Sequence, residues 1–348
     1  MGRVIAVANQ KGGVGKTTTA INLASSFAAA EVNTLLIDCD PQSNASSGLG
    51  LVKDPERIST YHLLMGAASA EEALQPTELE QLWIIPSHKN LIGANLELVE
   101  GERREYRLRD AIEPLRERYQ FIVLDCPPAL DLLTLNSLVA ADSVLIPMQA
   151  EYFALEGISE LLDTVERIRA GLNPELAIEG VVLTMLDDRT SLAKQVMAEL
   201  RKYFGDKLCA TSIPRNIRLA EAPSHGKPAL LYDVRSRGAE SYIRLAKEII
   251  AHYFAQAEAA GESPAVTAVA GEEQPVAEEQ TVAEVQAMDA SSSSEETSEG
   301  VAEVLHEDQA AAEAPTMHEV AVGQETPASS DTSEGEAAAG VDEMGKTA

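Results

Sequence analysis

The sequence is poor in cysteine, and its three cysteines lie far apart. Cys39, Cys126 and Cys209 form no C-x-x-C pair, which argues against a disulfide framework and a zinc site and fits a reducing compartment. No apolar run approaches the roughly 18 residues that a membrane-spanning helix needs, and the first residues carry no signal-peptide pattern. We therefore expect a cytoplasmic protein that does not interact with membranes.

Aromatic residues are also scarce, and none occurs after Phe254. The segment 257–348 consists largely of Ala, Glu, Ser, Thr and Pro. It has 22 acidic side chains and one basic one, Lys346, and so holds 21 of the 29 net negative charges. Such a segment cannot bury enough apolar surface to offset the entropy that ordering would cost. We predict a folded domain at residues 1–256 and a disordered acidic tail at residues 257–348.

A glycine-rich segment near the N-terminus follows a short apolar run. Val4–Ala8 predicts a buried strand, Thr19–Ala24 predicts the first part of a helix, and Gln10–Thr18 connects them. Glycines in such a loop let backbone N–H groups converge on phosphate oxygens, and the helix N-terminus adds the positive end of its dipole. Lys16 can then reach the terminal phosphates, and the Thr17 hydroxyl can bind Mg²⁺. The segment is a candidate phosphate-binding loop.

Two later apolar runs end in aspartate. Thr34–Asp38 is followed closely by Asp40, and the C-terminal ends of parallel strands line the ligand crevice of an α/β sheet. Phe121–Asp125 has the form of a Walker B strand, whose carboxylate holds Mg²⁺ through water. Alone, the Asp38–Asp40 pair would be better explained as two acidic turn residues before a proline. Together with the phosphate-binding loop, the aspartates indicate a site for a phosphorylated ligand and Mg²⁺.

Strands and helices alternate along residues 1–256. This alternation predicts a doubly wound, mostly parallel α/β sheet with helices on both faces, as in P-loop nucleoside triphosphatases. Residues 43–50 are expected to form a loop, and residues 54–81 a polar helix and a connection. Further strands are predicted at Trp83–Pro86, Ser143–Pro147, Ile178–Met185 and Leu208–Ile213, and helices at Glu102–Arg118, from Glu151 onward, at Leu192–Phe204 and at Tyr242–Phe254.

The phosphate-binding loop departs from the common pattern, because Gln10 stands where G-x-x-x-x-G-K-[ST] has its first glycine. A second lysine, Lys11, precedes the glycine pair instead. The run Lys11–Thr18 (KGGVGKTT) resembles the deviant Walker A loop, K-G-G-x-G-K-[ST]-T, of the ParA/MinD family of ATPases. Three further segments resemble the family, the last of them its chromosomal, Soj-type ParA members: Asp38–Gln42 (DCDPQ), Asp125–Pro128 (DCPP) and Glu151–Gly157 (EYFALEG).

This resemblance, which covers roughly residues 1–255, implies an ATPase that binds ATP and Mg²⁺ and closes into a homodimer around them. In the family the early lysine, here Lys11, reaches the partner's nucleotide, and the aspartate matching Asp40 orients the attacking water. The implied catalytic residues are Lys11, Lys16, Asp40 and Asp125, and the implied metal-binding residues are Thr17, Asp38 and Asp125. The implied nucleotide-binding residues are Lys11, Gly12, Gly13, Val14, Gly15, Lys16, Thr17 and Thr18, with Met185, Pro214 and Asn216 around the adenine.

The charge of the chain changes sign late in the predicted domain. From Arg189 to Lys247 there are 12 basic and 5 acidic residues, and such a region can be an electrostatic footprint for nucleic acid. Solvated helix faces would explain the same charges. The resemblance favours DNA, because Arg189 and Arg218 stand where chromosomal ParA proteins place DNA-contacting arginines. Further candidate DNA contacts are Arg215, Lys227, Arg235 and Arg237.

The resemblance thus implies a partitioning ATPase at the nucleoid. Its ATP-bound dimer would bind double-stranded DNA without sequence preference, and a ParB-like centromere-binding protein would trigger hydrolysis and release. Three other classes stay open. A MinD-like membrane ATPase would need a basic C-terminal helix, whereas the chain after Phe254 is acidic and would be repelled by anionic lipid. The second class, a metabolic enzyme of the dethiobiotin synthetase type, is disfavoured only by Lys11 and the ParA-like segments. The third, a reductase with a bridging iron–sulfur cluster, would need a suitable cysteine pair, which Cys126 alone does not supply.

Overall fold

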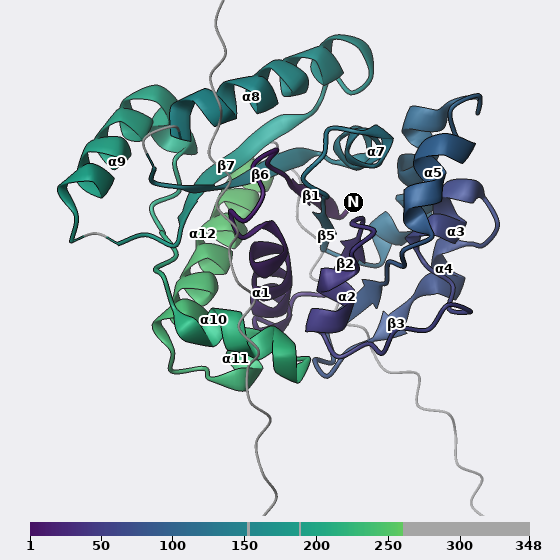
Figure 1. Cartoon of the computed structure of the whole chain (residues 1–348), viewed down its shortest axis with the longest axis horizontal. Helices are drawn as coiled ribbons and strands as arrows, with labels where there is room; N and C mark the ends of the chain where they lie inside the picture. The colour runs from purple at the N-terminus through teal and green to yellow at the C-terminus, as the bar shows by residue number, and fades with distance from the viewer. Residues whose placement is uncertain (152–153, 188, 260–348) are drawn as a thin grey trace, which may run out of the picture. The chain divides into compact units, whose positions relative to one another are not determined.

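The computed structural model describes residues 1–151, 154–187 and 189–259 (Figure 1). The predicted tail from residue 260 onward, Tyr152 and Phe153 of the segment Glu151–Gly157, and Asp188 therefore lie outside the described residues. Within this part of the chain every helix is too short or too polar to cross a lipid bilayer. The strands are β1 (Arg3–Val7), β2 (Thr34–Asp38), β3 (Gln75–Pro76), β4 (Leu82–Ile85), β5 (Phe121–Asp125), β6 (Ser143–Gln149) and β7 (Ala177–Thr184).

The helices connect these strands in chain order. The α-helices are α1 (Lys16–Ala29), α2 (Asn44–Gly48), α3 (Thr60–Met65), α4 (Ala70–Ala73), α5 (Leu91–Glu97), α6 (Arg107–Ile112), α7 (Leu132–Ala140), α8 (Ala154–Gly171), α9 (Ser191–Phe204), α10 (Ile217–Glu221), α11 (Ala229–Tyr232) and α12 (Arg237–Ala259). The 3-10 helices are η1 (Arg104–Tyr106), η2 (Glu113–Glu117), η3 (Gly205–Lys207) and η4 (Ala222–His225).

The described strands form one sheet in the order β3-β4-β2-β5-β1-β6-β7. Only the short edge strand β3 pairs in antiparallel fashion, and the other pairs are parallel. This confirms the predicted doubly wound, mostly parallel sheet. Asp125 of β5 lies in register with Asp38 of β2 on one side and with Val7 of β1 on the other. The C-terminal ends of three central strands therefore meet at one edge of the sheet.

Apolar side chains fill both faces of the sheet, because successive residues of a strand point to opposite faces. In β1, Val4 and Ala6 join the core beneath α3 to α9, whereas Ile5 and Val7 join the core beneath α1, α2 and α10 to α12. Helix α12 packs along α1 (Figure 1), and its Tyr242, Ala246 and Ile249 are buried in the core.

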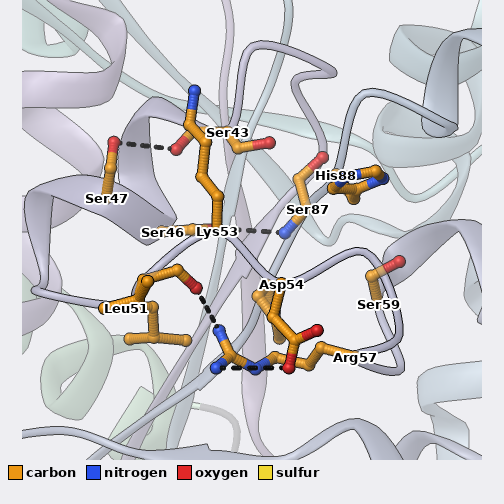
Figure 2. A pocket seen from close by; sticks show the side chains of 12 residues that line it. Ser43, Ser46, Ser47, Leu51, Lys53, Asp54, Arg57, Ser59, Ser87 and His88 are labelled. Atoms are coloured by element: carbon orange, nitrogen blue, oxygen red, sulfur yellow. Dashed lines mark hydrogen bonds and ion pairs between the residues drawn. The ribbon is translucent and has the colours of Figure 1, made fainter.

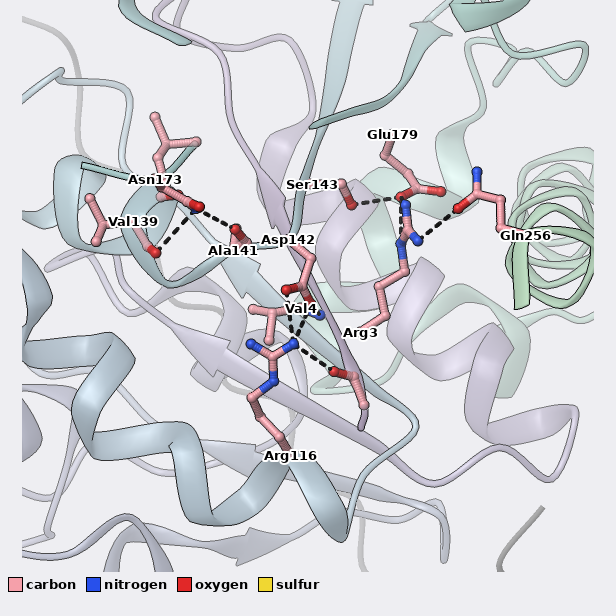
Figure 3. Close-up of polar contacts among 12 residues, drawn as sticks. Arg3, Val4, Arg116, Val139, Ala141, Asp142, Ser143, Asn173, Glu179 and Gln256 are labelled. Atoms are coloured by element: carbon pink, nitrogen blue, oxygen red, sulfur yellow. Dashed lines mark hydrogen bonds and ion pairs between the residues drawn. The ribbon is translucent and has the colours of Figure 1, made fainter. Parts of the chain in front are cut away.

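Ion pairs and hydrogen bonds hold the N-terminal edge of the sheet (Figure 3). Asp142, just before β6, accepts a hydrogen bond from Val4 N at 2.7 Å and from Arg116 Nη2 at 2.8 Å. Glu179 of β7 accepts one from Arg3 Nε, also at 2.8 Å. Hydrogen bonds between charged groups are stronger than neutral ones. Because the side chains at this edge bond to one another, we expect ligand-binding groups at the opposite edge, where the strands end.

The strand predicted at residues 208–213 is wrong. This segment makes only isolated backbone contacts with β7, among them Cys209 N to Val181 O at 2.9 Å. The next two N–H groups, of Ala210 and Thr211, donate to the Glu248 carboxylate of α12 at 2.7 and 3.0 Å. Because a side chain takes these donors, they are not available for a continuous ladder with β7.

The predictions for residues 43–50 and for Glu102–Arg118 are also wrong. The loop expected at residues 43–50 contains the short helix α2, where Ser46 N donates to the Asp38 carboxylate. The single helix expected at Glu102–Arg118 is divided into η1, α6 and η2. Pro114 explains the second break, because proline has no N–H and its ring crowds the preceding turn.

Candidate nucleotide-binding site

The loop between β1 and α1 has the backbone shape that its glycines predict. Gly13 (φ 74°) and Gly15 (φ 86°) lie in the left-handed region, which favours glycine, and Gly15 directly precedes α1. Lys16 begins α1, is only 7% exposed, and donates from Nζ to Lys11 O at 3.3 Å. Burial lowers the pKa of Lys16, and the nearby Asp125 opposes this shift. A buried cation at a helix N-terminus is suited to binding phosphate.

The ends of β6 and β7 support this loop. Thr184 Oγ1 donates to Val14 O at 2.7 Å, and Gln149 Nε2 donates to a carbonyl oxygen of the loop at 3.1 Å. The same Gln149 nitrogen lies 3.0 Å from the sulfur of Met185. The structure therefore brings the predicted adenine contact Met185 against the loop. Sequence analysis missed Thr184 and Gln149, and their position at strand ends was the only available signal.

Three buried carboxylates lie beside the loop: Asp38 and Asp125 are fully buried and Asp40 is 7% exposed. Asp38 Oδ2 accepts from Ser46 N at 2.8 Å and from Ser46 Oγ at 2.7 Å, and Oδ1 accepts from Asp40 N at 3.1 Å. Ser87 N in turn donates to Ser46 Oγ at 3.0 Å (Figure 2). Burial raises the pKa of Asp38 to about 6 despite these bonds. Ser46, which sequence analysis missed, thus fixes the orientation of Asp38.

Asp125 differs from Asp38, because neither of its oxygens has a hydrogen-bond partner among the described residues. Burial raises its pKa well above the ordinary value, Asp38 adds to the shift, and the Thr17 hydroxyl and Lys16 oppose it. An unpartnered buried carboxylate costs free energy that a bound cation would offset. The residues therefore fit Mg²⁺, with Thr17 and Asp125 to hold it directly or through water. Bound Mg²⁺ would neutralise charge on the phosphates.

The other lysine of the loop, Lys11, is paired with a residue outside the loop. Lys11 Nζ forms an ion pair with the Glu151 carboxylate, and the two side chains are 44% and 52% exposed. Exposed ion pairs contribute only about 0–1 kcal/mol, so Lys11 can leave Glu151 at little cost. Glu151 begins the segment that resembles chromosomal ParA proteins, but its pairing with Lys11 was not predicted.

The predicted adenine-binding residues come from two adjoining segments. Met185 directly follows β7 and has a positive φ of 50°, and the next residue, Leu186, donates from N to Ile213 O at 3.0 Å and bridges to Pro214. Asn216 caps α10, because its Oδ1 accepts from the backbone N of Arg218 at 2.9 Å. The structure thus places Met185 and Pro214 on adjoining segments, and the amide nitrogen of Asn216 stays available to bond a base.

Half of the predicted DNA contacts are engaged in ion pairs within the chain. Arg215, Arg235 and Arg237 are exposed, and no ion pair to any of them is present among the described residues. A DNA phosphate would have to compete with carboxylates at the other three positions. The three pairs are Arg189 with Asp187 (2.6 Å), Arg218 with Glu221 (2.8 Å) and Asp233 (3.4 Å), and Lys227 with Glu78 (2.9 Å).

The parallel sheet, the glycine-rich loop and the aspartates at the strand ends define a P-loop nucleoside triphosphatase fold. The profile of the AAA_31 family, described as an AAA domain, matches residues 2–178. Among solved structures, cobyrinic acid a,c-diamide synthase from Mycobacterium smegmatis with bound ADP and magnesium is similar, with a TM-score of 0.65 at 32% identity. The match covers 74% of this chain and 97% of that one.

Curated relatives are more similar in sequence. The chain is 53% identical over 250 residues to the chromosome partitioning protein ParA of Myxococcus xanthus, covering 72% of this chain and 88% of the relative. It is also 53% identical over 252 residues to the sporulation initiation inhibitor protein Soj of Bacillus subtilis, covering 72% and 100%. The chain belongs to the ParA/MinD-type family of P-loop ATPases, with relatives named ParA and Soj.

Proposed function

We propose that this protein is an ATPase that partitions DNA. ATP closes a homodimer, the dimer binds double-stranded DNA without sequence preference at the nucleoid, and a ParB-like centromere-binding partner stimulates hydrolysis and release. The single observation that carries the proposal is the different placement of the two lysine side chains of the loop. Lys16 lies buried against its own loop, whereas Lys11 points outward to Glu151. A second, outward lysine is unnecessary for binding a nucleotide in one subunit but is required to reach the nucleotide of a partner.

We place the ATPase activity in residues 1–256 and treat residues 257–348 as an acidic tail outside it. Helix α12 continues to Ala259, so the proposed boundary falls in its last turn. The names of the relatives, chromosome partitioning protein ParA and Soj, support a partitioning role over a metabolic one. The metabolic synthase with bound ADP and magnesium supports nucleotide and Mg²⁺ binding by this fold.

The site assigns separate tasks to its side chains. Lys16 and the N–H groups of the loop bind the phosphates, and Thr17 and Asp125 hold Mg²⁺, with Asp38 beside them. Asp40 Oδ1 accepts from Gln42 N at 2.9 Å, which leaves the second oxygen of Asp40 to orient the attacking water. A carboxylate fixed in this way loses little freedom when the water binds.

Replacing Asp40 with alanine should lower the rate of ATP hydrolysis roughly 100-fold or more, because a positioned group that acts on the reacting water contributes about 10²–10⁴-fold. ATP affinity should hardly change, since Asp40 binds no phosphate. The measurements are ATP turnover and the dimer fraction with ATP by analytical ultracentrifugation. Asp40→Asn is the matched control for shape and should also be slow. Wild-type turnover in both variants would remove Asp40 from its role.

The proposed function is tested by DNA affinity across a salt series with ATP and with ADP. With about three phosphate contacts per subunit, log K against log[salt] should have a slope near −2.7 for one subunit and near −5.4 for a dimer. The steeper slope should appear only with ATP, and affinity should not depend on base sequence. Anionic liposomes serve as the control surface. Sedimentation with liposomes instead of DNA would favour a MinD-like protein, and equal slopes with both nucleotides would contradict a dimer switch.

A further inference from the structure

The phosphate-binding loop is held to the sheet by two side chains from neighbouring strands. Gln149 is the last residue of β6, Thr184 is the last residue of β7, and the two are register partners in the parallel ladder. Gln149 Nε2 donates to Gly13 O at 3.1 Å, and Thr184 Oγ1 donates to Val14 O at 2.7 Å. Two successive carbonyl groups of the loop are therefore bonded to the sheet. We call Gln149 and Thr184 the loop brace.

The Thr184 half of the loop brace is buried. Thr184 is 2% exposed and Val14 is 1% exposed, so water does not readily replace the bond between them. The Thr184 hydroxyl has a single hydrogen, and Val14 O at 2.7 Å is a closer acceptor than Met148 O at 3.2 Å. Because a buried carbonyl that loses its donor costs free energy, this bond strongly constrains the peptide between Val14 and Gly15.

Fixing a carbonyl group also fixes the N–H group of the same peptide, because the two point in opposite directions across a planar trans peptide. The Gly13 carbonyl shares its peptide with Val14 N–H, and the Val14 carbonyl shares its peptide with Gly15 N–H. Both N–H groups are therefore turned away from the loop brace, and neither donates a hydrogen bond within residues 1–151, 154–187 and 189–259. Successive N–H groups beside residues of positive φ, here Gly13 and Gly15, form a concave site for anions.

A third side chain holds the first part of the loop to β6. Asn9 is 6% exposed, its Nδ2 donates to Pro147 O at 2.8 Å, and its Oδ1 accepts from Lys11 N at 2.9 Å. Together with the loop brace, this side chain ties the loop to the sheet across residues 11–14. All these bonds lie within the protein, so the loop is ordered before a ligand arrives. Groups that are ordered in advance lose less entropy when they bind.

We propose that Gln149 and Thr184 are positioning residues for the phosphates of ATP. They fix the directions of the Val14 and Gly15 N–H groups, and these N–H groups bind the phosphate oxygens. The inference rests on the nucleotide site of the proposed function, but not on dimerisation or on DNA. Because the same N–H groups bind the phosphates before and during hydrolysis, the loop brace contributes to ATP affinity more than to the turnover of bound ATP.

The first experiment separates the two parts of the Thr184 side chain. Thr184→Val keeps the shape and removes the hydroxyl, whereas Thr184→Ser keeps the hydroxyl and removes the methyl group. Affinity is measured by titration of a fluorescent ATP analogue with Mg²⁺, and kcat at saturating ATP. Thr184→Val should bind roughly tenfold more weakly, the low end for one lost hydrogen bond to a charged group. Its kcat should stay within about twofold of the intact protein.

Thr184→Ser should retain nearly the affinity of the intact protein, even where its thermal midpoint is lower because the methyl group is lost. If Thr184 acted only by packing, the order would be reversed, with Thr184→Ser the weaker binder of ATP. That reversed order would overturn the proposal.

Gln149→Met tests the other half of the loop brace and removes the amide donor at similar length. Gln149 is only partly buried, so this variant keeps the proposal testable if Thr184→Val does not fold. It should also bind ATP roughly tenfold more weakly. The matched control is Ser241→Ala, because Ser241 is 1% exposed and its Oγ donates to Arg237 O of α12 at 2.8 Å. An equal loss of affinity in this control would show that general destabilisation is the cause, and would overturn the loop brace.

A second measurement asks which part of the nucleotide the loop brace affects. Inorganic tripolyphosphate, which has no nucleoside, displaces the fluorescent ATP analogue, and its affinity should fall by the same factor as that of ATP in Thr184→Val and Gln149→Met. Weaker ATP binding with unchanged tripolyphosphate binding would assign both side chains to the nucleoside and overturn the proposal. Full ATP affinity in both variants would overturn only the loop brace, whereas failure of the intact protein to bind ATP would overturn the proposed function.

Discussion

Replacing Lys16 with alanine should weaken ATP binding by more than a hundredfold. Lys16 is nearly buried and is the cation that the loop encloses. Hydrogen bonds to charged groups contribute about 1.5–3 kcal/mol each, so the loss of two such bonds to phosphate costs about 3–6 kcal/mol. The measurement is a titration with a fluorescent ATP analogue at a protein concentration too low for dimerisation. Wild-type affinity in Lys16→Ala would show that the loop is not the nucleotide site.

Lys11→Ala is the matched control, because it removes the same charge from the same loop. The Lys11 side chain is half exposed and, among the described residues, is bonded only to Glu151, so its loss should spare ATP binding by the monomer. It should instead abolish ATP-dependent dimerisation, measured by analytical ultracentrifugation. A Lys11→Ala protein that still dimerises with ATP would exclude the proposed role of Lys11 across the dimer.

Replacing Asp125 with asparagine should lower ATP turnover about a thousandfold, on the scale of the several kcal/mol that a catalytic metal supplies. The same change should raise the thermal midpoint of the nucleotide-free protein. Asp125 is fully buried, and burial raises its pKa well above the ordinary value. Each unit of that shift is worth about 1.4 kcal/mol, or roughly 3–5 °C for a domain of this size. Asparagine carries no charge and removes this cost.

The sign of the pH dependence follows from the raised pKa. Between the ordinary pKa and the raised one, the folded protein holds a proton that the unfolded chain has released. Stability contributed by Asp125 is therefore lost as pH rises through this interval. The stabilisation of Asp125→Asn over the intact protein should grow with pH and then level off, as followed by circular dichroism melts. Asp206→Asn, an exposed control, should show no such trend. A less stable Asp125→Asn protein at pH 8 would contradict the account.

Local sequence patterns were sufficient to predict those parts of the site that lie on one continuous segment. The run Lys11–Thr18 determines both the loop and the helix that follows it, and Asp38 and Asp125 could be placed because strand ends in a parallel sheet meet at one edge. Ser46 and Glu151 could not be assigned, because their roles arise only when the fold brings them to Asp38 and Lys11. No spacing rule connects residues that meet in this way.

The misplaced elements separate into those whose cause is visible in the sequence and those that depend on tertiary contacts. Pro114 was visible within the predicted helix 102–118 and is a known helix breaker. The segment 208–213 has the apolar content of a strand, but Glu248 of α12 takes two of its N–H groups. Likewise, the net charge of the basic region could be counted from the sequence. The carboxylates that form ion pairs with Arg189 and Lys227 could not be identified from it.

The unpartnered carboxylate of Asp125 also bears on the lifetime of the protein in a cell. A ligand that binds only the folded state stabilises it by mass action, and Mg²⁺ with nucleotide would offset the cost of burying the Asp125 carboxylate, which has no hydrogen-bond partner among the described residues. The nucleotide-free form should then open more often than the nucleotide-bound form, and proteases act on opened forms. We therefore expect the protein to be more open to proteolysis when the supply of nucleotide falls than when nucleotide is plentiful.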